Sequence, residues 1–274
     1  MNSLVSVEWL KENLSNPNLI ILDASPTSNK SGLTPDYKDC QIPKTRKFDT
    51  ENVFVDKNNT ITNMFPSEST FEKECQNLGI NSDSIIVVYD NLGVYMSPRA
   101  WWMFKSFGHE NVTVLDGGLS AWVNAGYDIE KNTVTNFAKG NFEARYIYEN
   151  IKDSSFLVKN IESRESVVID ARSEGRFNGT LPEPRENMQS GHIPNAINLP
   201  FKEVLKDGML KSSKDLKKVF SNLKLKDKDL VFSCGSGVTA CIIMLASKQF
   251  NRNKHSLYDG SWSEWGLGKK FPVE

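Results

Sequence analysis

The sequence predicts two tandem α/β domains, each built on a mostly parallel sheet with helices on both faces. Three observations lead to this fold class. The chain has 274 residues, more than one domain usually holds, which favours two domains of about 130 residues each. In each half, short β-branched runs alternate with amphipathic helical segments, as in sheets covered by helices on both sides. An internal repeat also relates the two halves.

The repeat consists of three matched segments. Residues 20–25, a buried strand ending in an acidic loop, match residues 167–172. Residues 84–95 match residues 229–239, and this match pairs Asp90 with Cys234 at an offset of 144 residues. A third match relates residues 115–122 to residues 258–265 at an offset of 143.

These matches predict two copies of one domain. We expect the first over residues 1–135, a linker over residues 136–148 and the second over residues 149–274. The linker is expected there because the sequence around it is polar and has no sustained periodicity.

One helix in the first copy has signals at both ends. Ser97 is expected as its N-cap, Pro98 as its first helical residue and Gly108 as its stop. The large aromatic side chains between them wrap most of the helix and are expected in the core: Trp101, Trp102, Phe104 and Phe107.

The chemistry is expected in the second copy, where a short buried strand, a glycine-rich turn and a helix follow one another over residues 230–245. The turn opens on Cys234. Gly235 and Gly237 can adopt positive φ, so successive backbone N–H groups could point at one atom at the start of the helix. Such a cradle stabilises negative charge, and we expect it to lower the pKa of the Cys234 thiol and keep the nucleophilic thiolate. A cysteine after an apolar strand is otherwise more often a buried small hydrophobe, and the loop reverses that expectation.

The residues after the cysteine narrow the substrate class. A phosphate-binding Cys-x5-Arg loop would need arginine where this chain has Ala240. The run Cys-Gly-Ser-Gly-Val-Thr instead resembles the active-site loop of 3-mercaptopyruvate sulfurtransferases, in the rhodanese superfamily. Thiosulfate sulfurtransferases are similar but carry an Arg-Lys pair in place of Gly235 and Ser236. The resemblance covers nearly the whole chain, and it implies an inactive first rhodanese-like domain with Asp90 at the nucleophile position.

The resemblance also assigns site residues. It implies Cys234 and Ser236 as catalytic, with Ser236 relaying a proton to the departing enolate, in an active-site loop that includes Gly235, Gly237, Val238 and Thr239. The segment Gly-Arg-Phe-x-Gly-Thr-x-Pro-Glu-Pro-Arg is similar to the family segment whose two arginines bind the carboxylate and carbonyl of the substrate, here Arg176 and Arg185. Arginine suits a carboxylate because its planar fork can donate two parallel hydrogen bonds.

Two further positions are compared with the family. His192 lies in a Gly-His-Ile-Pro-Asn-Ala context that resembles a structural turn of rhodanese domains, so a structural role is expected. Accounts of the family add a histidine and an aspartate of the first domain to the serine relay. Here we expect Gln41 where that histidine would be, which puts a histidine-dependent relay in doubt.

The implied activity is transfer of sulfur from 3-mercaptopyruvate to a thiol or cyanide through a Cys234 persulfide, with release of pyruvate. The resemblance implies no metal and no organic cofactor, and an acceptor thiol such as a thioredoxin-like protein. Two alternatives stay open: a thiosulfate:cyanide sulfurtransferase, and a non-catalytic sulfur carrier or interaction module.

Composition limits the partners and the compartment. No run of about 18 apolar residues occurs and the first residues do not resemble a signal peptide, so we expect a soluble cytoplasmic protein without a membrane partner. The four cysteines have neither C-x2-C spacing nor nearby histidines, so neither a zinc site nor a disulfide framework is expected. The lysine-rich run over residues 206–228 lacks interleaved arginines and aromatics, so nucleic acid is not expected as a partner.

Overall fold

The computed structural model describes residues 2–27, 32–132, 136–223, 225, 227–251 and 253–274. Its contacts divide the chain into two compact units. The first consists of Met1–Lys57, Phe65–Ile147 and Lys206–Leu210, and the second of Asn58–Met64, Tyr148–Leu205 and Lys211–Glu274. Each unit therefore includes one short segment from the other half of the sequence.

The first unit contains a five-stranded parallel sheet with the strand order β1-β6-β5-β2-β4. In the middle of this sheet, Ile86 pairs with Ile20 on one side and with Val112 on the other. The strands are β1 (Leu4–Val5), β2 (Leu19–Asp23), β4 (Arg46–Lys47), β5 (Ile85–Tyr89) and β6 (Val112–Leu115). A separate antiparallel pair is formed by β3 (Cys40–Gln41) and β7 (Glu130–Lys131).

The second unit has the same sheet topology. Its parallel strands are β8 (Ile151–Lys152), β9 (Ser166–Asp170), β10 (Ile197–Asn198), β13 (Asp229–Ser233) and β14 (His255–Tyr258). Taken from β8, their order is β8-β14-β13-β9-β10, which repeats the first sheet strand for strand in chain order. The internal repeat predicted from the sequence is confirmed. A two-stranded sheet of β11 (Leu205–Lys206) and β12 (Met209–Leu210) is separate.

Helices alternate with these strands, as the sequence pattern predicts. The first half of the chain contains α1 (Val7–Asn13), α2 (Glu68–Asn77), α3 (Ser97–Ser106) and α4 (Gly118–Asn124). The second half contains α5 (Ser154–Ser163), α6 (Glu174–Phe177), α7 (Ser213–Ser221), α8 (Thr239–Lys248) and α9 (Ser261–Trp265), with 3-10 turns η1 (Tyr148–Asn150) and η2 (Phe201–Val204). No helix in the described part of the chain is both long enough and apolar enough to cross a membrane.

The start of α3 differs from the prediction by one residue. Ser97 is the first helical residue and Met96 the N-cap, and the side chain of this N-cap residue makes no capping hydrogen bond. The reason is that the Ser97 hydroxyl donates to the carboxylate of Asp90 at 2.7 Å. Gly108 follows the helix at φ 83, as expected of a stop signal. The aromatic side chains of this segment are buried, as predicted: Trp101, Trp102, Phe104 and Phe107.

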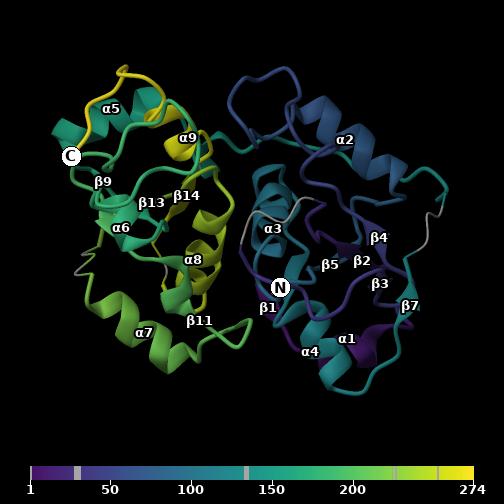
Figure 1. Cartoon of the computed structure of the whole chain (residues 1–274). Coiled ribbons are helices and arrows are strands. Elements are labelled where there is room, and N and C mark those ends of the chain that lie inside the picture. Colours follow the sequence, from purple (N-terminus) through teal and green to yellow (C-terminus); the bar gives the residue numbers. More distant parts are fainter. Residues whose placement is uncertain (1, 28–31, 133–135, 224, 226, 252) are drawn as a thin grey trace. The chain divides into compact units, whose positions relative to one another are not determined.

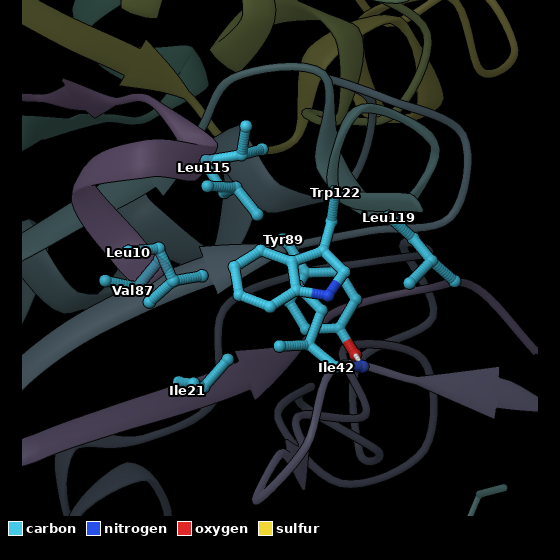
Figure 2. Packing of buried hydrophobic residues seen from close by; sticks show 9 residues of the cluster. Leu10, Ile21, Ile42, Val87, Tyr89, Leu115, Leu119 and Trp122 are labelled. Atoms are coloured by element: carbon cyan, nitrogen blue, oxygen red, sulfur yellow. Dashed lines mark hydrogen bonds between the residues drawn. The ribbon is translucent and has the colours of Figure 1, made fainter. Parts of the chain in front are cut away.

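Both faces of the first sheet are covered. Val87 and Tyr89 point to the face where Leu10 of α1 and Trp122 of α4 pack, and Figure 2 shows these side chains in one buried cluster. Val88 points to the opposite face because side chains alternate along a strand, and it is fully buried as well. On that face α3 contacts β5 and β6 (Figure 1). Each fully buried aliphatic side chain stabilises the fold by about 1.5–3 kcal/mol.

The stretch predicted as a linker packs on the first unit where it is described. Phe142 is fully buried, and its backbone N–H donates to Ile80 O at 3.1 Å. Further along, the N–H of Ile147 donates to Ser106 O at 2.8 Å. The predicted domain boundaries stay a prediction. These contacts favour a boundary between the two units close to Ile147.

Candidate active site

Cys234 lies directly after the central strand of the second sheet. β13 is buried from Leu230 to Ser233, and α8 begins at Thr239 after a short turn (Figure 1). The predicted order of strand, turn and helix around this cysteine is therefore present. Cys234 is only 2% exposed, so a reactant has to enter the turn to reach the sulfur.

A turn at the start of α9 fixes the backbone of Cys234. The cysteine N–H donates to Ser261 Oγ at 3.2 Å, and its carbonyl accepts from the N–H of Trp262 at 2.9 Å. Ser261 has φ 48, in the left-handed region, and its hydroxyl donates to Tyr258 O at 2.8 Å. In the first copy Gly118 takes the matching position at φ 55. The repeat thus preserves a left-handed residue that supports the loop.

The two glycines of the loop serve different purposes. Gly237 has φ 76, as predicted, and a residue with a Cβ would be strained there. The expectation of positive φ is wrong for Gly235, which is not in the left-handed region. A Cβ at Gly235 would instead lie 3.2 Å from Nη2 of Arg176 and 3.8 Å from Nη1 of Arg185. Gly235 therefore provides the space that lets two cations approach the loop.

The first copy shows what this kind of loop can hold at the nucleophile position. The fully buried Asp90 carboxylate accepts five hydrogen bonds, four from backbone N–H groups at 2.8–3.0 Å and one from a hydroxyl at 2.7 Å. Burial raises the pKa of Asp90, and the donated hydrogen bonds offset part of that rise. The donors are the amides of Leu92, Tyr95, Met96 and Ser97 and the Ser97 hydroxyl. The loop of the first copy is thus an anion cradle filled by its own side chain.

A similar hydrogen-bonding pattern is expected around Cys234 in the second copy, because the strands before the two loops correspond. Ile85–Tyr89 and Asp229–Ser233 occupy the same place in their sheets at the 144-residue offset that pairs Asp90 with Cys234. We therefore expect the matching backbone N–H groups to surround the Cys234 sulfur. They belong to Ser236, Thr239 and Ala240, whereas the N–H of the fourth matching residue, Cys241, donates to Val238 O at 3.0 Å.

The two predicted substrate-binding arginines meet at the residue after the cysteine. Arg176 lies in α6, and Arg185 lies in the loop that follows. Nη1 of Arg185 donates to Gly235 O at 3.2 Å, and Arg176 lies beside the Cα of the same glycine. The structure therefore brings both guanidinium groups next to the nucleophile position.

A buried charged network supports Arg176. The Glu183 carboxylate accepts from Arg176 Nε at 3.1 Å and Nη2 at 2.5 Å, and from Arg172 Nη1 at 2.8 Å. Arg172 also pairs with Asp170 at 2.7 Å and lies 4.1 Å from the centre of the Trp262 ring. The side chains of Glu183, Arg172 and Asp170 are at most 2% exposed. Each buried charge has an opposite partner, as the cost of desolvation requires.

Ser236 contacts a residue that the sequence analysis did not single out. Nδ2 of Asn63 donates to Ser236 Oγ at 3.1 Å. Asn63 belongs to the segment Asn58–Met64, which is part of the second unit. Gln41, expected at the place of the family's histidine, lies in the first unit, where its Nε2 donates to Glu130 Oε1 at 2.8 Å. Among the residues that the structure describes, the side chain that meets Ser236 is therefore Asn63.

Both halves of the chain match one family model, which describes a rhodanese-like domain. The matched residues are 6–125 and 154–267. The chain belongs to the rhodanese family. The predicted resemblance and the predicted pair of rhodanese-like domains are confirmed.

Rhodanese-family proteins similar over nearly the whole chain include two curated enzymes. A 3-mercaptopyruvate sulfurtransferase of Escherichia coli strain K12 is 35% identical over 274 residues, covering 98% of this chain and 97% of that protein. A thiosulfate sulfurtransferase of Mus musculus is 36% identical over 275 residues, covering 96% and 91%. A crystal structure of a 3-mercaptopyruvate sulfotransferase from Escherichia coli has a TM-score of 0.84 and 33% identity, covering 96% of this chain and 100% of that one.

His192 and Cys241 have packing roles in the rhodanese fold of this chain. The His192 ring stacks on Phe177 with centroids 3.7 Å apart, and Nδ1 bonds to Phe177 O at 2.9 Å, which supports a structural role. Cys241 is fully buried in α8, and its sulfur lies 3.3 Å from Gly237 O.

Three residues of this rhodanese site were missed by sequence reasoning. Glu183 stands inside the motif that carries both arginines, and the position of Ser261 follows from its match to Gly118. Asn63 has no comparable signal, because it lies far along the chain from the loop that it contacts.

Proposed function

We propose that this chain is a 3-mercaptopyruvate sulfurtransferase in which Cys234 carries the transferred sulfur. The observation that supports this substrate best is the convergence of Arg176 and Arg185 on Gly235. Two guanidinium groups suit a carboxylate next to a carbonyl, since each can donate more than one hydrogen bond in a fixed geometry. 3-Mercaptopyruvate presents that pair of groups beside the carbon that bears its sulfur.

The first half-reaction forms the persulfide. The Cys234 thiolate attacks the sulfur of 3-mercaptopyruvate, a sulfur–sulfur bond forms and the carbon–sulfur bond breaks. The bonding electrons leave on carbon as the enolate of pyruvate, which takes up a proton to give pyruvate. Arg176 and Arg185 hold the carboxylate and carbonyl, and the loop amides stabilise the negative charge on sulfur before and after transfer.

Ser236 is proposed to deliver the proton to the enolate. Its hydroxyl is two residues from the nucleophile, and Asn63 donates to its oxygen at 3.1 Å. A hydroxyl oxygen that accepts from an amide has its own proton free to point elsewhere. The remaining loop residues, Gly237, Val238 and Thr239, shape the turn.

The second half-reaction removes the outer sulfur. A thiolate or cyanide attacks it, the sulfur–sulfur bond breaks and the Cys234 thiolate is restored. The outer sulfur extends about 2 Å beyond the cysteine sulfur, which brings it nearer to solvent. An acceptor thiol still has to enter a site whose cysteine is 2% exposed, so we propose a small thiol or a protruding thiol of a thioredoxin-like protein.

We propose a cytoplasmic location for this reaction. All four cysteines are free thiols, in keeping with a reducing compartment. Cell fractionation, with an antibody used to detect the protein in each fraction, tests this location. Recovery of the protein in an organelle fraction would contradict it.

One experiment tests the proposed activity. The reduced protein is exposed to 3-mercaptopyruvate or thiosulfate, and its intact mass and its Cys234 peptide are measured before and after cyanide is added. We expect a gain of one sulfur atom on Cys234, release of pyruvate, loss of the added mass with cyanide and a higher kcat/KM for 3-mercaptopyruvate. No gain with either donor would favour a non-catalytic module.

The second candidate is a thiosulfate sulfurtransferase. This alternative activity is supported by the 36% identity between this chain and a mouse thiosulfate sulfurtransferase. Gly235 and Ser236 add no cation for a doubly charged donor, which favours 3-mercaptopyruvate. A higher kcat/KM for thiosulfate in the same assay would reverse this choice.

A further inference from the structure

We infer that Glu183 sets the net charge of the donor site and thereby favours a donor with one negative charge over a donor with two. This inference rests on the proposed function, because it explains how the same site selects its substrate class. It gives Glu183 the role of a specificity-determining residue that acts through Arg176.

The buried network behind the loop is electrically balanced. It contains the carboxylates of Asp170 and Glu183 and the guanidinium groups of Arg172 and Arg176. Glu183 lies between the two arginines, with oxygen–nitrogen distances of 2.8 Å to Arg172 and 2.5 Å to Arg176. Its side chain is 1% exposed, so water screens these pairs weakly. Arg176 can therefore donate hydrogen bonds to a donor while adding little net charge.

Arg185 differs from Arg176 in this respect. Its hydrogen bond goes to the neutral carbonyl of Gly235 at 3.2 Å. Among the residues that the structure describes, no carboxylate lies within ion-pair distance of Arg185. Both arginines beside Gly235 can thus donate hydrogen bonds to a substrate, but only Arg185 has a positive charge that no carboxylate compensates.

One uncompensated charge matches a monoanion. The single carboxylate of 3-mercaptopyruvate can be neutralised by Arg185 and oriented by both arginines. Thiosulfate carries two charges, so one of them would enter a buried site without a partner, which is costly. The charge state of the network, and not only the sequence of the loop, therefore discriminates between the donors.

The test removes the carboxylate charge while keeping the size of the side chain. In Glu183→Gln the charge of Arg176 is no longer balanced, so kcat/KM for thiosulfate with cyanide as acceptor should rise about tenfold, with no equal rise for 3-mercaptopyruvate. Glu183→Asp is the matched control, because it shortens the side chain but keeps the charge, and it should give no rise with thiosulfate. A folded Glu183→Gln protein whose thiosulfate kcat/KM is unchanged or lower would overturn the inference.

A second variant covers the case in which Glu183→Gln does not fold, which thermal unfolding would reveal. Arg185 is half-buried and lies outside the balanced network, so Arg185→Gln should fold. If Arg185 supplies the uncompensated charge, the kcat/KM of this variant for 3-mercaptopyruvate should depend much less on salt than that of the wild type. Retention of the full salt dependence would refute the inference.

Binding measurements separate this inference from the proposed function. Titrations of the Cys234→Ser protein with sodium pyruvate and sodium sulfate, with and without Glu183→Gln, need no turnover. The added substitution should strengthen sulfate binding relative to pyruvate about tenfold. If that shift occurs but the wild type uses neither donor, the proposed activity fails and the charge inference holds. If the wild type uses 3-mercaptopyruvate but the shift is absent, only the charge inference fails.

Discussion

Replacement of Gly235 by alanine should weaken use of 3-mercaptopyruvate by displacing Arg176. The new Cβ would lie 3.2 Å from Arg176 Nη2, a separation at which the neighbouring group has to move by a few tenths of an ångström. Arg176 cannot move freely, because its Nη2 and Nε both bond to the Glu183 carboxylate. Glu183 is in turn held by Arg172.

The size of the effect follows from these hydrogen bonds. Complete loss of one charged hydrogen bond costs about 1.5–3 kcal/mol, which is the upper limit for this substitution. A displacement of a few tenths of an ångström weakens the bond without breaking it, so we expect about 1 kcal/mol, or roughly a fivefold fall in kcat/KM. The fall should appear mainly in KM, because the position of the donor changes while the nucleophile and its amides remain.

The assay is a double-mutant cycle on donor kinetics. Steady-state rates with 3-mercaptopyruvate and cyanide are measured for the wild type, Gly235→Ala, Arg176→Gln and the combination. Arg176→Gln alone should lower kcat/KM by roughly 10- to 150-fold. If Gly235 acts through Arg176, the alanine substitution should have little further effect in that background.

The matched control is Gly237→Ala in the same loop. Its φ of 76 makes any side chain unfavourable by about 1–2 kcal/mol, independently of the arginines. Its effect should therefore persist in the Arg176→Gln background and should also appear in denaturant unfolding. An unchanged KM in Gly235→Ala, or a full effect without Arg176, would refute the close-approach argument.

Three further predictions concern other parts of the protein. Cys234→Ser should abolish persulfide formation, measured by mass spectrometry, while Cys241→Ser should retain it, and the reverse result would move the nucleophile. Asn63→Ala should lower kcat with little change in KM if its hydrogen bond orients the Ser236 hydroxyl, whereas a change confined to KM would argue against that role. Burial lowers the pKa of His255 to about 3 from the ordinary 6.5, so below pH 6.5 the unfolded chain binds a proton that the folded chain does not. Stability should be full above that pH and fall by about 2 kcal/mol by pH 5 in urea unfolding. His255→Gln should flatten this dependence, and an equally steep profile in the variant would assign the effect to another group.

The sequence was enough to predict three features. These are the two rhodanese-like copies, the strand and turn around Cys234, and the pairing of Asp90 with Cys234. They follow from patterns that repeat locally: buried strands of five residues, left-handed glycine after a strand, and nearly equal offsets of 144 and 143 residues for two of the matched segments. The arginine positions came from a resemblance, since nothing local shows that Arg176 and Arg185 approach the same glycine. Even the start of α3 was one residue off, because the Ser97 hydroxyl bonds to Asp90 and not to its own helix.

The tertiary structure alone decided which side chains lie against the proposed site residues. Asn63 meets Ser236 across 173 residues of sequence, and the side chain of Gln41 donates to Glu130. The net charge that Arg176 adds to the site depends on the buried carboxylate of Glu183, 2.5 Å away. The order of residues along the chain does not reveal this distance. Sequence patterns report the periodic burial of a chain, whereas the charge and hydrogen bonding of a site depend on distances between segments that only folding brings together.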